Sequence, residues 1–191
     1  MQKIIVKTAL ITVSVVLIAC VLICGGILLF NSRLSAEFFS NMGNEKKALQ
    51  YYERGYERDA TEENLLLVIH SSIIAEDSAV LIEYFTVFDA KRDGAKNTHE
   101  EFLASKYCTA LCEKNESDSA LITAKKYVGS YSEGCAPRAL MAYALNKNDD
   151  ALLHKVLLLL EEIAKENANE FSEASLGLLN SDIQILKQLS V

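Results

Sequence analysis

Apolar and polar positions divide the chain into two parts. An uncharged, mainly apolar run extends from Thr8 to Phe30, whereas beyond Asn31 apolar residues recur every three or four positions with charged residues between them. That spacing is typical of amphipathic helices, and no stretch alternates apolar and polar residues as a half-buried strand would. The pattern predicts an all-α protein with an apolar N-terminal segment (8–30) and a helical domain (31–191).

The apolar run is long enough to cross a membrane. Its 23 residues would extend about 34 Å at a helical rise of about 1.5 Å per residue, whereas the apolar region of a signal peptide is about 7–15 residues long. We therefore predict an uncleaved transmembrane helix over 8–30, preceded by a short positive region, 1–7. Lys3 and Lys7 on the N-terminal side, against Arg33 on the other, place the N-terminus in the cytoplasm and the helical domain outside.

A second interpretation of the same run stays open. Leu17-Ile18-Ala19-Cys20 resembles the lipobox of bacterial lipoproteins, in which the cysteine is acylated and becomes the new N-terminus. A polar tether is expected after such a cysteine, but the chain continues apolar from Val21 to Phe30. The alternative is a lipoprotein with the same helical domain, acylated at Cys20.

Several helices are expected after the apolar run. They cover 43–60, 63–75, 80–88, 98–112, 120–131, 137–145, 150–165 and 171–189, with turns at Gly43-Asn44 and Glu76-Asp77 and a polar loop over 90–97. Thr98 and Glu101 predict a capping box at the start of one helix.

The expected core follows from the helical spacing. Ala48, Tyr52 and Gly55 share one face, and the two small residues allow a neighbouring helix to approach closely. In helix 98–112 we expect a second buried set, comprising Phe102, Tyr107, Leu111 and Cys112. Residues 156–160 are apolar nearly all round their helix, so they are expected to be covered on more than one side.

The segment GNEKKALQYYERGYERDA resembles the second helix of a tetratricopeptide repeat (TPR). The family positions fall on Gly43, Ala48, Tyr52, Gly55 and Ala60, where Gly55 replaces the usual alanine and Ala60 the usual proline. The later segments match the family in period, with units 34 to 38 residues apart, and not in letters. The resemblance implies a solenoid of helical hairpins over 31–191.

The same resemblance implies a function. TPR domains bind proteins or peptides in a groove lined by the first helix of each unit, and the corresponding candidates here are Asn64, Leu67 and Ser71. A single-pass membrane protein of this class would act as a scaffold or assembly factor for a protein or peptide partner. No motif for catalysis or cofactor binding is present, so we expect neither an enzyme nor a bound cofactor.

The net charge and the cysteines of the helical domain indicate which ligands it is expected to bind. Residues 31–191 carry 17 basic and 26 acidic side chains, a net charge of −9 that disfavours nucleic acids and anionic lipid surfaces. Outside the apolar run, three cysteines (Cys108, Cys112 and Cys135) form a poor disulfide framework and are expected in the core. The alternative is that this trio makes the domain a metal-handling accessory module of a membrane enzyme complex.

Overall fold

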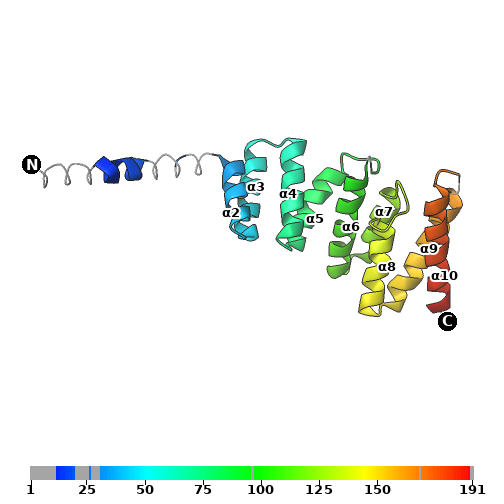
Figure 1. Cartoon of the computed structure of the whole chain (residues 1–191). Coiled ribbons are helices and arrows are strands. Elements are labelled where there is room, and N and C mark those ends of the chain that lie inside the picture. Colours follow the sequence, from blue (N-terminus) through cyan, green and yellow to red (C-terminus); the bar gives the residue numbers. More distant parts are fainter. Residues whose placement is uncertain (1–11, 20–25, 27–30, 96, 168, 190–191) are drawn as a thin grey trace, which may run out of the picture. The chain divides into compact units, whose positions relative to one another are not determined.

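The computed structural model describes residues 12–19, 26, 31–95, 97–167 and 169–189, and these residues form helices joined by turns and loops, with no strand (Figure 1). The predicted all-α class is confirmed. The chain divides into two compact units, residues 1–71 (unit 1) and 72–191 (unit 2), and the boundary falls inside helix α4.

Residues 12–19 are helical and expose their large apolar side chains, which include Val13, Val16 and Ile18. Apart from residue 26, the rest of the predicted span 8–30, including Cys20, lies outside the described residues, as does the whole of the predicted positive region 1–7. Within the described part of the chain, no helix is both long and apolar enough to cross a membrane.

Unit 1 contains a helical hairpin, made of α2 (Ser32–Asn41) and α3 (Glu45–Arg58). Gly43 forms the predicted turn with φ +72°, a conformation that favours glycine, and Asn44 caps α3 by accepting the Lys47 N–H at 3.2 Å. Ala48 is fully buried. A Cβ added at Gly55 would lie 3.6 Å from Ser32 Cβ, so the two helices approach closely, as predicted.

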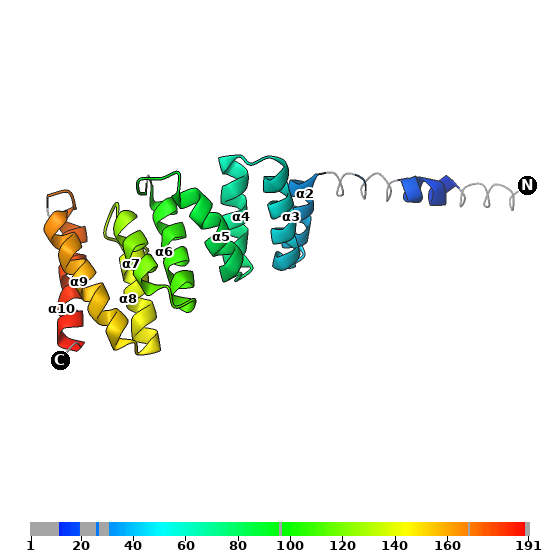
Figure 2. The same cartoon turned by 180° about the vertical axis from the view of Figure 1, so that it is seen from behind.

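Helix α4 (Glu62–Ile74) follows, and six further helices lie in unit 2 as described (Figures 1 and 2): α5 (Ser78–Asp89), α6 (Thr98–Glu113), α7 (Ser117–Lys126), α8 (Ala136–Lys147), α9 (Asp150–Glu166) and α10 (Glu173–Leu189). Turns with a left-handed residue, at Glu76, Asn115 and Asn148, join α4 to α5, α6 to α7 and α8 to α9. The C-terminal segment forms one helix, which begins at Glu173.

Small residues let the helices of unit 2 pack closely. Ala104 and Cys108 of α6, Ala120 and Ala124 of α7, and Ala144 of α8 are all fully buried. Helix α6 packs against both α7 and α8, and α9 packs against both α8 and α10. The predicted burial of Tyr107, Leu111 and Cys112 is confirmed, as is that of the three cysteines outside the apolar run.

Several local predictions are wrong. The cap of α6 is Asn97, whose Oδ1 accepts the Glu100 N–H at 2.9 Å, and Thr98 is the first helical residue. Glu101 does not close a capping box, because its carboxylate accepts the Ser130 N–H at 2.9 Å. Helix α7 ends at Lys126, not at residue 131.

The other errors concern burial. Phe102 is 38% exposed, and Tyr52 is only half-buried. The predicted coverage of residues 156–160 on more than one side is confirmed, because four of the five are buried and α9 packs against α7, α8 and α10, although Leu158 is 53% exposed. These differences arise because helical spacing identifies residues that share a face and does not tell which face a neighbour covers.

Candidate functional site

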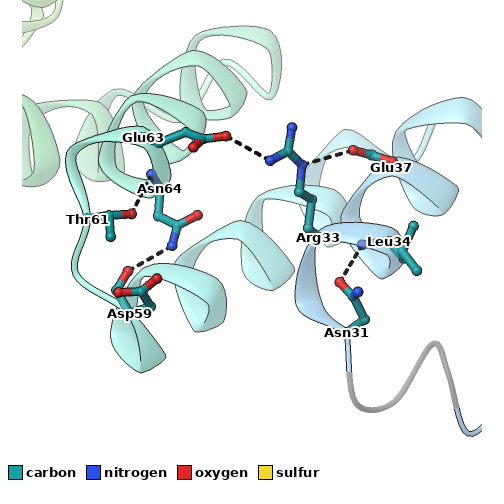
Figure 3. Close-up of polar contacts among 8 residues, drawn as sticks. All are labelled: Asn31, Arg33, Leu34, Glu37, Asp59, Thr61, Glu63 and Asn64. Atoms are coloured by element: carbon teal, nitrogen blue, oxygen red, sulfur yellow. Dashed lines mark hydrogen bonds and ion pairs between the residues drawn. The ribbon is translucent and has the colours of Figure 1, made fainter.

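The predicted binding residues Asn64, Leu67 and Ser71 lie along one face of α4, since they are spaced by three and four residues. Figure 3 shows the first of them at the start of the helix. Asn64 Nδ2 donates to the Asp59 carbonyl at 2.8 Å, and the Asn64 N–H donates to Thr61 Oγ1 at 3.3 Å. Asn64 therefore holds the connection between α3 and α4, which is a structural task.

This face of α4 becomes more buried toward the C-terminal end of the helix. Leu67 is half-buried, and Ser71 is only 4% exposed, with a hydroxyl that has no hydrogen-bond partner among the described residues. A buried hydroxyl cannot contribute to a surface that a partner touches. Of the three candidates, Asn64 and Leu67 remain accessible in part and Ser71 does not.

An exposed arginine joins α2 to α4 beside this face. Arg33 Nη1 lies 2.8 Å from Glu63 Oε1, and Arg33 Nε lies 3.3 Å from Glu37 Oε1 (Figure 3). The hydrogen bond to Glu63, followed by that to Glu37, raises the pKa of the Arg33 guanidinium. Because all three side chains are solvated, this pair of bridges orients the helices and contributes little to stability.

Unit 2 contains an apolar groove that the sequence did not indicate. It lies between α7 and α9 and has a volume of about 390 Å³. Its floor consists of Leu121 and Ile122 of α7 and Leu158 and Leu159 of α9. Ile122 is 71% exposed and Leu158 is 53% exposed, so large apolar side chains face solvent from both walls. Contiguous exposed apolar surface of this kind marks an interaction site more often than an isolated apolar side chain does.

Ion pairs close both ends of the groove. At one end Lys155 Nζ lies 2.6 Å from Asp118 Oδ1, and at the other Lys125 Nζ lies 2.8 Å from Glu162 Oε1 and 3.0 Å from Glu166 Oε2. Hydrogen bonds to Glu162 and then Glu166 raise the pKa of Lys125. The Lys155–Asp118 end is balanced in charge, whereas Lys125 at the other end faces two carboxylates, so the groove offers an apolar floor between two charged ends.

Ion pairs in and beside the groove recur at one spacing in the sequence. The contacts Asp118–Lys155 and Lys125–Glu162 each join positions 37 residues apart, and so does Lys126 with Asp89, at 2.7 Å between Nζ and Oδ1. Helix α7 thus contacts α9 in parallel through two pairs of positions, and it contacts the end of α5 through one pair at the same spacing. The predicted repeat length of 34 to 38 residues includes this spacing.

The cysteine trio lies in the core of unit 2. The Cys108 thiol donates to the Ala120 carbonyl at 3.3 Å. Burial raises the pKa of Cys108 and Cys135, and it raises the pKa of Cys112 to about 11. The thiols therefore stay protonated at neutral pH, whereas metals and electrophiles react with the thiolate. The described residues bring together no three His, Cys, Asp or Glu side chains that could hold a metal ion.

Sequence reasoning missed Ile122 and Leu158. The sequence does contain a pattern that could have identified them. Residues 121 and 122 correspond to 158 and 159 at a spacing of 37, and each apolar pair has a charged residue three positions before it and another three positions after it.

A scan against protein-family models and searches of curated proteins and of solved structures found no match to the chain.

Proposed function

We propose that this chain is a membrane-anchored, TPR-like helical-repeat protein that binds a protein or peptide partner and acts as a scaffold or assembly factor. The helical domain would stand on the extracytoplasmic side, as the charge flanking the apolar run indicates. Anchoring confines the binding domain to the plane of the membrane, and this raises its effective concentration toward partners in the same membrane.

Two observations support the architecture. The uncharged run 8–30 has the length of a span, and its described part, 12–19, is a helix with exposed apolar side chains. The TPR-like pattern at Gly43, Ala48 and Tyr52 belongs to one hairpin, and the contacts 37 positions apart belong to the hairpins of unit 2. A repeat of this length is expected of stacked helical hairpins.

The α7/α9 groove is the observation that carries the binding function. On each wall the lining residues span seven positions, so the groove extends over about two helical turns, roughly 10 Å, from one ion pair to the other, with the apolar floor at its centre. A partner helix that places apolar side chains over this central floor would match the groove. This groove is formed by second helices, whereas the family resemblance places the ligand on first helices.

Site-specific photo-cross-linking tests the proposal in the cells that make the protein. A photoreactive amino acid is placed at Ile122 or at Leu158 of the full chain, and as a matched control at Leu145, an exposed residue of α8. We expect the same partner protein, identified by mass spectrometry, at positions 122 and 158 and not at 145. Leu158→Lys should abolish the adduct formed from position 122, since a charge would enter the apolar floor.

Two results would contradict this proposal. If positions 122 and 158 yield no adduct beyond that of position 145, or if the adduct formed from 122 persists in the Leu158→Lys protein, the groove is not the binding site. The folding of each variant is checked by its helical circular dichroism, so that loss of the adduct cannot be attributed to unfolding.

A further inference from the structure

Helix α2 carries an apolar stripe that its own hairpin does not cover. Leu34, Phe38 and Met42 are 43%, 44% and 66% exposed, and they follow one another at intervals of four residues. The buried residues of α2 are Ser35 and Ala36, and its Phe39 stacks on Tyr51 of α3, with ring centroids 5.4 Å apart. An aligned stripe of three large apolar side chains differs from scattered exposed residues, because it can be buried on a single surface.

The place of α2 in the chain specifies that surface. Only Asn31 separates the apolar run from the first residue of α2, and Asn31 Oδ1 accepts the Leu34 N–H at 3.1 Å, so the helix begins immediately after the run. Leu34 is four residues beyond Phe30, which limits their separation to about 14 Å in any chain conformation. A stripe that starts so close to the end of a membrane span lies within reach of the lipid headgroups.

Charge distribution agrees with this placement. Segment 31–61, which contains α2 and α3, has five basic and five acidic side chains, whereas residues 72–191 have 12 basic and 19 acidic ones, a net charge of −7. The hairpin of α2 and α3, next to the apolar run, is therefore neutral overall and would not be repelled by an anionic surface.

We infer that α2 is an interfacial helix, whose Leu34, Phe38 and Met42 side chains insert into the headgroup region of the membrane that holds the N-terminal segment. The inference rests on the proposed membrane anchor. Amphipathic helices of this kind place their apolar face about 5–10 Å into the boundary between headgroups and acyl chains. The contact would fix the orientation of unit 1 at the membrane surface.

Fluorescence quenching by lipid tests this contact. The full chain is reconstituted in phosphatidylcholine vesicles with brominated acyl chains, and an environment-sensitive fluorophore is attached to a single added cysteine. Asn41→Cys reports on the stripe without altering it, Gln50→Cys on α3 is the exposed control, and Val16→Cys reports on the anchor. Cys20 and Cys24 are replaced by alanine, native thiols 108, 112 and 135 are buried, and protein without an added cysteine sets the background.

We expect strong quenching at 16, quenching at 41 at least twofold greater than at 50, and a blue-shifted emission at 41. Replacing Leu34, Phe38 and Met42 by serine should reduce quenching at 41 to the level at 50 and leave position 16 unchanged. Quenching at 16 with equal, weak quenching at 41 and 50 would overturn the interfacial helix and leave the anchor standing.

Two other outcomes are decisive. Absence of quenching at 16 would refute the membrane anchor, and the interfacial helix with it. Disulfide cross-linking between two copies through position 41, without lipid quenching there, would show that the stripe is covered by a second copy of the chain, and this result would also overturn the lipid contact.

Discussion

A buried carboxylate in unit 2 permits a quantitative test of the fold. Asp182 of α10 is only 2% exposed. Its Oδ2 accepts a hydrogen bond from the Tyr131 hydroxyl at 2.8 Å and lies 2.7 Å from Arg138 Nε of α8. Tyr131, in the loop after α7, is itself buried, so the three side chains join that loop to two helices.

Removing one member of this network should lower the free energy of unfolding, because the remaining polar groups would stay buried without their partner. Tyr131→Phe deletes a hydrogen bond to a charged acceptor, and we expect it to lower the free energy of unfolding by about 1.5–3 kcal/mol. Asp182→Ala breaks the ion pair. Because the Arg138 side chain is 23% exposed and can be rehydrated, the expected loss is about 3 kcal/mol, the lower end for a buried pair.

Urea unfolding of the full chain in detergent measures these losses. Far-UV circular dichroism follows the helices, and the reactivity of the buried thiols at Cys108, Cys112 and Cys135 reports on unit 2 alone. Tyr143→Phe, which removes a hydroxyl from a half-buried tyrosine of the same unit, is the matched control and should cost less than about 0.5 kcal/mol.

A double-mutant cycle completes the test. In the Asp182→Ala background, Tyr131→Phe should cost at least about 1 kcal/mol less than in the native chain, because its acceptor is already absent. A cost for Tyr131→Phe no greater than that for Tyr143→Phe, or additive costs in the double variant, would refute the assignment of stability to this buried network.

Three further predictions concern backbone and thiols. Gly94→Ala should destabilise the protein by about 1–3 kcal/mol, because Gly94 has φ +145° and an added Cβ would lie 2.9 Å from the Lys126 carbonyl oxygen; an unchanged urea midpoint would contradict this. Gly177→Ala should stabilise it by about 0.5–1 kcal/mol, seen as a higher melting temperature, since the site is inside α10 and has no atom within 4 Å of the added Cβ. Burial raises the pKa of Cys112 from 9.0 to about 11, so the unfolded chain loses this proton first and stability should fall as pH rises from about 9 to 11. In Cys112→Ala that fall should be smaller, and an identical pH profile would exclude the thiol as its source.

The sequence alone determined the helical class and the approximate position of the helices after residue 31. Those features depend on interactions between near neighbours. Apolar residues recur with the helical period, the turn at Gly43 needs a left-handed backbone that glycine adopts readily, and the small residues Ala48 and Ala120 mark helix contacts. The membrane span, the TPR-like assignment and the partner remain predictions from the same source.

Only the tertiary structure decided which faces are covered. Phe102 and Leu158 belong to apolar patterns and yet are exposed, whereas the polar Asp182 is buried because Arg138 and Tyr131, 44 and 51 positions away, satisfy it. The α7/α9 groove likewise depends on residues 37 positions apart. Burial is set by contacts between helices distant in sequence, and a local pattern cannot report which neighbour, if any, a helical face will meet.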